Sequence, residues 1–419
     1  MRKVLIFLVI TLSSLSGFCS QILIPMDEKQ TNHLKAYGIA YWVLTQDVEI
    51  DWLLNYRGGS FMMQYYQKFE NELIIRGISY EIISDAQSNQ IIATISSPSS
   101  NTDVMKLQKA PKVAVYSPKN KQPWDDAVTM VLTYAEIPYD VIFDDEVHAD
   151  ELPKYDWLHL HHEDFTGQYG KFYANYRRAP WYIEQKALSE ASAKKHGFDK
   201  TSQLKLGTVK KIRNFVAGGG FLFAMCSATD TYDIALAAEN TDICDYMFDG
   251  DPADPAAQSK LNFTNTFAFE NFKLERNPMV YEFSNIDNQK RERGLTERND
   301  YFTLFEFSAK WDPIPTMLTQ NHIKVVKGFM GQTTAFKKTL IKGDVTILGE
   351  TKSIDEARYI NGIFGKGFWT FYGGHDPEDY EHFVNEDPTD LNLHPNSPGY
   401  RLILNNILFP AAKKKKRKT

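Results

Sequence analysis

The sequence predicts an α/β fold in which helices cover both faces of a parallel β-sheet. From residue 111 onward, short apolar segments alternate with segments of helical spacing, the pattern of chains that build parallel sheets. A predicted helix over residues 208–217 ends in three glycines and leads directly into an apolar strand over 221–225. Glycine just past a helix supplies the left-handed backbone that turns the chain into the next element.

The composition is that of a folded globular protein. The chain has 419 residues, of which 43% are hydrophobic and 13% aromatic, and its net charge is −6. Disordered and collagen-like classes are excluded by these values, and the acidic balance provides no overall attraction for nucleic acid. Length alone suggests two or three domains of about 100–200 residues, although one elaborated domain also fits.

The N-terminus has the pattern of a secretory signal. Met1-Arg2-Lys3 precedes an apolar run over 4–12 and then small and polar residues over 13–17. We expect a signal over residues 1–20 and an exported protein, periplasmic or secreted. A lipoprotein anchored at Cys19 and a buried N-terminal strand are the alternatives. The run is shorter than the ~20 residues that span a bilayer, and no later stretch is long enough, so no transmembrane segment is predicted.

Removal of that signal leaves two cysteines, Cys226 and Cys244. A disulfide-stapled scaffold is therefore excluded, although a single bridge between the two remains open.

Residues 21–109 predict a small α+β domain. Apolar-rich segments over 36–44, 48–55 and 78–83 indicate strands, and 61–75 has helical spacing. The polar stretch 96–102 indicates a linker or an exposed loop before the next domain.

Residues 110–412 predict the main α/β domain. Strands are expected over 113–116, 139–143, 157–160, 221–225 and 365–372, with helices over 124–135, 208–217 and 400–408. An antiparallel insertion over about 251–350, with strands over 279–283, 301–307 and 339–348, interrupts the alternation and is a candidate lid. Residues 413–419 form a basic tail, expected to be a solvated end.

The strongest candidate for chemistry follows the strand over 365–372. Gly373-Gly374-His375-Asp376-Pro377-Glu378 places a histidine beside carboxylates after a glycine turn. A carboxylate can orient an imidazole and raise its basicity, which suits acid–base catalysis. A simple turn in which Asp376-Pro377 caps a helix is the alternative.

A second candidate is Cys226, directly after the strand over 221–225. A nucleophile on a sharp strand-to-helix turn needs small residues two positions to either side, and Ala224 and Ala228 meet that condition. The start of the next helix would direct amide donors toward Cys226 and Ser227. A buried, inert cysteine is the alternative.

Further candidates follow two other strands. His159, His161 and His162 precede Glu163, and strand alternation puts His159 and His161 on one face and His162 on the other. We expect His161, His162 and Glu163 to contribute to binding. A divalent metal is kept as an alternative, but no metal site and no cofactor are predicted. Ser117, Trp124 and Asp125 follow the first strand and are expected to line the pocket, although Asp125 could equally cap a helix.

These residues carry a resemblance to a known family. The segments 364–378 and 400–409 resemble those of the ThuA-like (trehalose-utilisation) branch of the class I glutamine amidotransferase-like superfamily, with its Gly-Lys-Gly strand, Gly-His-Asp-Pro-Glu turn and closing helix. The resemblance covers roughly 110–250 and 355–410 and implies a flavodoxin-like parallel sheet. Two departures are Ala224 and Ala228 where amidotransferases have glycines, and Glu378 three residues after the histidine rather than two.

The whole chain also looks like exported bacterial proteins labelled asparagine synthetase B. That activity resembles an N-terminal-cysteine glutaminase joined to an ATP-pyrophosphatase. This chain has no cysteine after Met1 and no Ser-Gly-Gly-x-Asp-Ser phosphate loop. The residues therefore do not support a synthetase.

Three functions follow as expectations, all with a small-molecule partner. The first is a hydrolase or lyase-like enzyme on a small polar substrate, a class that includes carbohydrate-derived molecules, in which His375 is a general base oriented by Asp376 or Glu378. The second is a thiol amidohydrolase, or glutaminase, with Cys226, His375 and Glu378 as a triad. The third is a non-catalytic binding or envelope module. The oligomeric state is left open.

Overall fold

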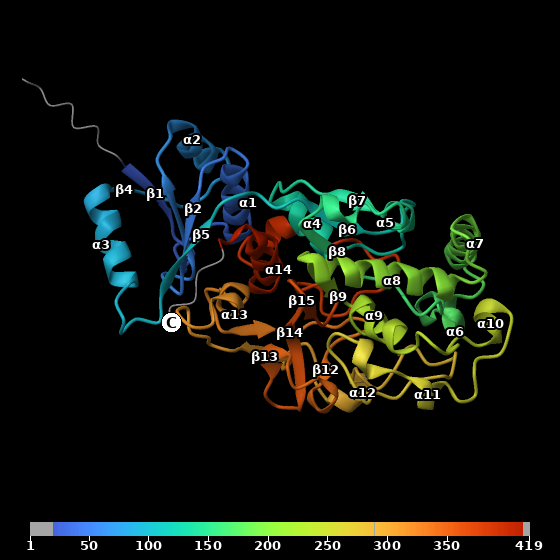
Figure 1. Ribbon diagram of the computed structural model, residues 1–419. Coiled ribbons are helices and arrows are strands. Elements are labelled where there is room, and N and C mark those ends of the chain that lie inside the picture. Colours follow the sequence, from blue (N-terminus) through green and yellow to red (C-terminus); the bar gives the residue numbers. More distant parts are fainter. Residues whose placement is uncertain (1–19, 289, 414–419) are drawn as a thin grey trace, which may run out of the picture.

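The computed structural model describes residues 20–288 and 290–413, which form two β-sheets surrounded by helices (Figure 1). Apart from Ser20, the predicted export signal and the alternative lipid site at Cys19 lie outside the described residues. Apart from Lys413, so does the basic tail. Within the part of the chain that is described, no helix is long and apolar enough to cross a membrane.

The N-terminal part forms a five-stranded antiparallel sheet in the order β4-β1-β3-β2-β5. Its strands are β1 (Ser20–Ile24), β2 (Ile50–Leu54), β3 (Ser60–Gln64), β4 (Glu81–Ser84) and β5 (Asp103–Leu107). Its helices are α1 (His33–Leu44), α2 (Gln67–Ile75) and α3 (Asp85–Ile95). The coarse expectation of an α+β unit agrees with this arrangement.

Two element predictions in this part are wrong. The segment 36–44 is helix α1 rather than a strand, because ten of the twelve α1 residues are buried and the helix shows no polar face to reveal its period. The segment 61–75 is strand β3 followed by α2. Of the two alternatives for the polar stretch 96–102, the exposed loop is the one that forms, since the stretch joins α3 to β5 inside the unit.

The second sheet has ten strands, and five of them run parallel in the order β7-β6-β8-β9-β15. They are β6 (Val113–Tyr116), β7 (Asp140–Ile142), β8 (Trp157–Leu160), β9 (Phe221–Met225) and β15 (Gly367–Tyr372). All five coincide with predicted strands to within three residues. The predicted α/β class is therefore confirmed in its coarse form.

The other strands extend this sheet in antiparallel fashion from β15, in the order β11-β10-β13-β14-β15, and β12 pairs with β14. They are β10 (Tyr301–Leu304), β11 (Val325–Lys327), β12 (Phe336–Lys337), β13 (Thr346–Thr351) and β14 (Glu356–Phe364). The predicted insertion is thus antiparallel, as expected, and its strands extend the main sheet. The predicted strand over 279–283 does not form.

Helices cover both faces of the parallel half. On one face α4 (Ala127–Tyr134) and α14 (Pro398–Leu408) pack on residues such as Val115 and Phe223. On the other, α5 (Asp144–His148), α8 (Thr201–Gly218) and α9 (Ser227–Ala237) pack on residues such as Ala114 and Leu222. Ala114 and Val115 are neighbours in sequence, as are Leu222 and Phe223. Successive side chains of each strand therefore point to opposite faces of the sheet, and both faces are buried.

The N-terminal sheet is joined to the main sheet by helices. Helix α1 packs against α14, and the core of the N-terminal unit is continuous with that of the main sheet (Figure 1). The remaining helices are α6 (Tyr173–Tyr176), α7 (Pro180–Lys195), α10 (Tyr246–Asp249), α11 (Ala257–Lys260), α12 (Lys290–Arg293) and α13 (Pro313–Leu318).

Candidate functional site

Four loops meet at the carboxyl edge of the parallel strands, the edge where open α/β sheets bind ligands. They follow β6, β8, β9 and β15, and they carry most of the residues predicted from sequence. Backbone hydrogen bonds connect the loops. The Cys226 N–H donates to the Gly374 carbonyl at 3.1 Å, and the Ala228 N–H donates to the His161 carbonyl at 3.0 Å. The site is therefore built on a connected backbone frame.

Cys226 occupies a strained turn between β9 and α9. Its φ of +49° and ψ of −139° lie in a region that L-residues rarely adopt. A nucleophile raised on a strand-to-helix elbow is held in such a strained turn. The residue is 4% exposed, and the Gln332 N–H donates to its Sγ at 3.3 Å. The expected elbow is therefore present in the backbone geometry.

His375 follows a glycine turn that only glycine can form. Gly374 has a φ of +103°, and a Cβ there would lie 2.4 Å from the Phe329 ring. The His375 N–H then donates to the Met330 carbonyl at 2.9 Å. These contacts fix where the imidazole enters the site.

The His375 imidazole contacts a carboxylate and shares the wall of one cavity with the thiol. Its Nε2 is 3.0 Å from Asp125 Oδ1, and Cys226 lines the same cavity as His375. Burial alone would lower the pKa of His375, but the hydrogen bonds with Asp125 and Cys226 outweigh it and raise the pKa to about 10. Burial likewise opposes ionisation of Asp125, whose pKa is nevertheless lowered by its hydrogen bond with His375.

The structure places Asp125, and not Asp376 or Glu378, against the imidazole. Asp376 is buried and accepts hydrogen bonds from the Tyr400 and Thr389 hydroxyls, both at 2.7 Å. Glu378 pairs with His394 at 3.1 Å. These two carboxylates therefore anchor the turn to α14 and to the following loop, although they are adjacent to His375 in the sequence.

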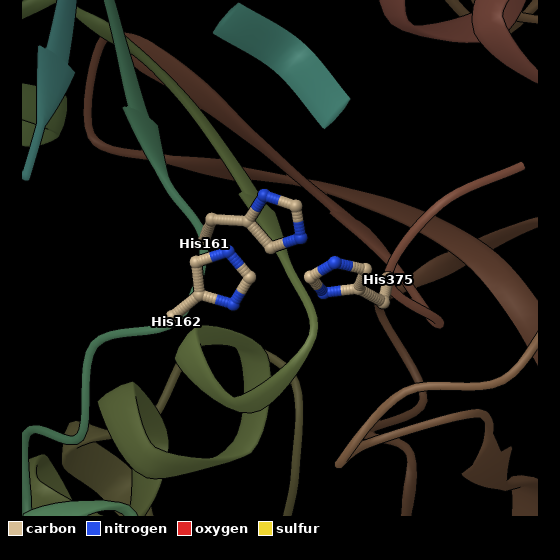
Figure 2. Close-up of side chains that lie close together, drawn as sticks. All are labelled: His161, His162 and His375. Atoms are coloured by element: carbon tan, nitrogen blue, oxygen red, sulfur yellow. The ribbon is translucent and has the colours of Figure 1, made fainter. Parts of the chain in front are cut away.

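His161 and His162 both face the same cluster, so the predicted alternation does not extend to them. Strand β8 ends at Leu160, and the two rings stack with centroids 3.9 Å apart. Figure 2 shows them close to the His375 ring, whose centroid lies 4.9 Å from that of His161 and 4.7 Å from that of His162. His159, within β8, is fully buried between Trp157 and Phe223.

Asp125 and Asp126 supply oxygens to these histidines. The Asp125 carbonyl is 2.6 Å from His162 Nε2, and the Asp126 carboxylate is 3.4 Å from His161 Nδ1. Asp126 also caps α4, whereas Asp125, the other candidate cap, does not. Burial lowers the pKa of His161 to about 4 and holds that of His162 well below its usual value.

Two cavities adjoin the cluster and share Trp124 and His162 in their walls. The first, which we call the cleft, has a volume of about 240 Å³ and is also lined by Cys226, Ser227 and His375. The second has a volume of about 390 Å³ and is lined by Ser117 and Glu163. Of the predicted binding residues, Ser117 and Glu163 therefore lie beside the neighbouring cavity rather than the cleft.

Most residues that line the cleft were not predicted from the sequence, among them Gln332, His382 and Tyr281. Gln332 contributes a backbone N–H, which has no sequence signal. His382 stacks on His375 with centroids 4.5 Å apart, and its position seven residues after His375 in the same polar loop could have been noticed. Tyr281 comes from a segment without regular structure and lines the cleft beside Phe172.

Two buried carboxyls hold the segment that carries Gln332. Asp230 accepts from the Thr333 hydroxyl at 2.8 Å, and Asp287 accepts from the backbone N–H groups of Thr334 and Ala335 at 3.0 and 2.9 Å. Burial raises the pKa of Asp230 to about 8 and that of Asp287 to about 7, against 3.8 ordinarily. The folded protein therefore holds protons that the unfolded chain releases.

We expect the free energy of unfolding to decrease as the pH rises from about 4 to about 8, because both carboxyls must then ionise while buried. The stabilisation is complete below their unfolded pKa values and is lost as the pH passes through the folded ones. An Asp230→Asn variant should show a smaller fall in Tm between about pH 6 and pH 9 than the wild type. Calorimetry checks this, and identical slopes for the two proteins would contradict it.

Comparison with known proteins adds no assignment. No protein-family model and no curated protein matches the chain. Two cytoplasmic proteins from Salmonella typhimurium align with 72% of the chain and 100% of their own length, at 11% and 12% identity and TM-scores of 0.35. A GH42 β-galactosidase from G. stearothermophilus aligns over 64% of this chain and 28% of its own, at 12% identity and a TM-score of 0.28. The chemistry of the site is therefore what bears on function.

Proposed function

We propose that this protein is a thiol-dependent hydrolase that cleaves an amide or ester of a small polar molecule. Cys226 is the nucleophile, His375 transfers protons, and Asp125 orients His375. One observation carries the proposal: an imidazole that is hydrogen-bonded to a carboxylate lines the same cleft as a thiol held on a strained elbow.

The fold supports this proposal at a finer level. Numbered along the chain, the parallel strands β6, β7, β8, β9 and β15 lie in the order 2-1-3-4-5, the order of flavodoxin-like sheets. Cys226 follows the fourth of these strands and His375 the fifth. This placement agrees with the resemblance to the ThuA-like branch of the class I glutamine amidotransferase-like superfamily. It also favours the thiol amidohydrolase among the functions expected from sequence.

The reaction would proceed through a thioester. The Cys226 thiolate forms a bond to the substrate carbonyl carbon, and the carbonyl electron pair moves onto its oxygen. The Gln332 N–H, 3.3 Å from Sγ, is a donor positioned beside the developing oxyanion. When the carbonyl re-forms, the bond to the leaving group breaks and His375 gives that group a proton.

Water completes the cycle. His375, now neutral, takes a proton from a water molecule as the water oxygen attacks the thioester carbon. The carbon–sulfur bond then breaks, the acid product leaves, and the thiolate–imidazolium pair is restored. Asp125 holds the imidazole in one orientation through both transfers, because its carboxylate accepts from Nε2 at 3.0 Å.

The walls of the cleft indicate the class of substrate. Trp124, Phe172 and Tyr281 form an aromatic side, and Glu282, Asp287 and Glu381 bring carboxyl groups. The described residues that line it include neither lysine nor arginine. A volume of about 240 Å³ suits a small molecule. We therefore favour a neutral or cationic substrate with hydroxyl or amide groups, which includes carbohydrate-derived amides, over a phosphate or a polycarboxylate.

Alkylation tests the thiol directly. Iodoacetamide at neutral pH should label Cys226 in the native protein and leave Cys244 unlabelled, because Cys226 lines the cleft together with the His375 imidazole, and an adjacent base activates a nucleophile. Cys244 is an internal control, since it is fully buried, its thiol contacts the Thr166 carbonyl, and burial raises its pKa. Peptide mass spectrometry identifies the labelled residue.

The same experiment distinguishes the roles of the partners. His375→Gln should slow labelling of Cys226 by about tenfold or more, and Asp125→Asn should slow it by less, because Asp125 acts through the imidazole. Native protein that resists labelling at Cys226 but becomes labelled after denaturation would overturn the proposed nucleophile.

A further inference from the structure

We propose that His161, His162 and His375 together form a binding site for one divalent transition-metal ion of the Zn²⁺ type. Each of the three offers a ring nitrogen, and these nitrogens lie within 4.8 Å of one another. Figure 2 shows the three rings gathered at one point, with His161 and His162 arriving from the end of β8 and His375 from the loop after β15. Three imidazoles at such spacing can surround a single ion.

His161 supplies an independent observation. The residue is 1% exposed, and neither of its ring nitrogens has a hydrogen-bond partner. Buried polar atoms are normally satisfied, because an unpaired group loses its hydration without compensation. A bound ion would take up the lone pair of one nitrogen, and the Asp126 carboxylate, 3.4 Å from Nδ1, lies on the side of the other.

The second shell of such a site is already in place. Histidine ligands usually donate their second ring N–H to a carboxylate or a carbonyl, which fixes the tautomer. His375 Nε2 lies 3.0 Å from the Asp125 carboxylate, and His162 Nε2 lies 2.6 Å from the Asp125 carbonyl. Asp126 lies 3.4 Å from His161 Nδ1, so each of the three imidazoles has an oxygen near one of its nitrogens.

The donor set indicates which ions fit. Imidazole nitrogens suit Zn²⁺, Cu²⁺, Ni²⁺ and Co²⁺, whereas Mg²⁺ and Ca²⁺ prefer oxygen ligands. Asp125, His375 and His382 form a neighbouring group that shares His375. We place the ion at the three histidines because Asp125 already accepts the Nε2 hydrogen of His375 as an outer partner. If the ion has tetrahedral coordination, three positions are taken by the histidines, and the fourth coordination position remains for solvent or for the Cys226 thiolate.

Occupancy of this site has a consequence that rests on the proposed function. An ion bound to His375 takes the nitrogen that would otherwise exchange a proton with Cys226. Zn²⁺ would therefore be a reversible inhibitor of the hydrolase, and a chelator would restore activity. In the metal-loaded protein, iodoacetamide labelling of Cys226 should slow by about tenfold or more.

Calorimetric titration with Zn²⁺ tests the site without any substrate. Chelator-treated wild type should bind one equivalent at the site, and His161→Gln and His162→Gln should each weaken binding by about 100-fold or more because one of three ligands is lost. His382→Gln is one matched control. His196→Gln is a second, since His196 pairs with Asp145 at 2.8 Å and is not part of the three-histidine group. Both variants should leave the affinity within about threefold. Absence of saturable binding below about 1 mM, or loss of binding in His382→Gln with retention in His161→Gln, would overturn the proposal.

A measurement on the wild type tests the site even if one of the variants does not fold. X-ray absorption of the zinc-loaded protein should show three histidine nitrogens in the first shell at 2.0–2.1 Å, the usual Zn–N distance. A first shell of oxygen ligands alone would overturn the site. Zn²⁺ binding is measured without turnover, so the two proposals can fail separately. Zn²⁺ binding in a protein whose Cys226 resists alkylation would contradict the proposed hydrolase and support the metal site.

Discussion

Cys226→Ala should abolish hydrolysis of a small activated ester or amide, with kcat/KM falling by at least about 10³-fold. The reason is that the nucleophile and its proton-transfer partner act as a unit, so removal of either leaves only binding and the oxyanion donor. A p-nitrophenyl ester of a short polar acid gives a continuous absorbance assay. The rate with each variant is divided by the fraction of folded protein.

The control for this experiment is Cys244→Ser. It removes the other cysteine of the described chain, which is buried, donates to the Thr166 carbonyl and does not line the cleft. We expect kcat/KM to stay within about twofold of wild type. Equal activity of Cys226→Ala and wild type would exclude Cys226 as the nucleophile. It would favour instead the enzyme in which His375 is the general base.

Asp300→Ala should be the most destabilising single change outside the site. Asp300 is fully buried and pairs with Arg293 at 2.8 Å and with Arg358 at 3.4 Å, while Glu356 pairs with Arg293 at 2.7 Å. Loss of Asp300 leaves two buried guanidinium groups with one carboxylate. Breaking a buried ion pair in this way typically costs about 3–5 kcal/mol in the free energy of unfolding.

The control is Glu306→Ala, which removes a surface pair with Lys324 at 2.6 Å in which both side chains are more than half exposed. Its effect should stay below about 1 kcal/mol. Urea denaturation of both variants measures the difference. An Asp300→Ala variant as stable as Glu306→Ala would show that the network contributes little.

This network also connects stability to the site. Arg358 donates to the Phe329 carbonyl, and Phe329 packs in the place that a Cβ on Gly374 would need. The segment continues to Met330 and Gln332, which contact His375 and Cys226. We therefore expect that substitutions in the network displace the Gln332 N–H, the oxyanion donor, more than they displace Cys226.

The location of the site could be predicted from sequence because parallel strands end at one edge of their sheet. Loops after four of those strands carry Asp125, His161, Cys226 and His375, and the structure brings all four together. Short apolar strands between helices were sufficient to place these loops. The prediction needed only the order and direction of the strands, which the alternating pattern indicates.

The pairing within the site could not be predicted. Glu378 and Asp376 are sequence neighbours of His375, yet its carboxylate partner Asp125 comes from a loop 250 residues earlier. Only tertiary packing brings these loops face to face. The buried helix α1 was missed for a related reason, since a helix that is apolar on every side gives no 3.6-residue period. Strand β14, which joins the insertion to the main sheet, was not predicted at all.

Trapping the acyl-enzyme tests the central claim most directly. The protein would be mixed with a p-nitrophenyl ester, quenched in acid during turnover, digested and analysed by mass spectrometry. We predict that the peptide containing Cys226 gains the mass of the acyl group, and that hydroxylamine removes it as expected for a thioester. Turnover of the ester with no adduct on Cys226, or with the acyl group on another residue, would contradict the account.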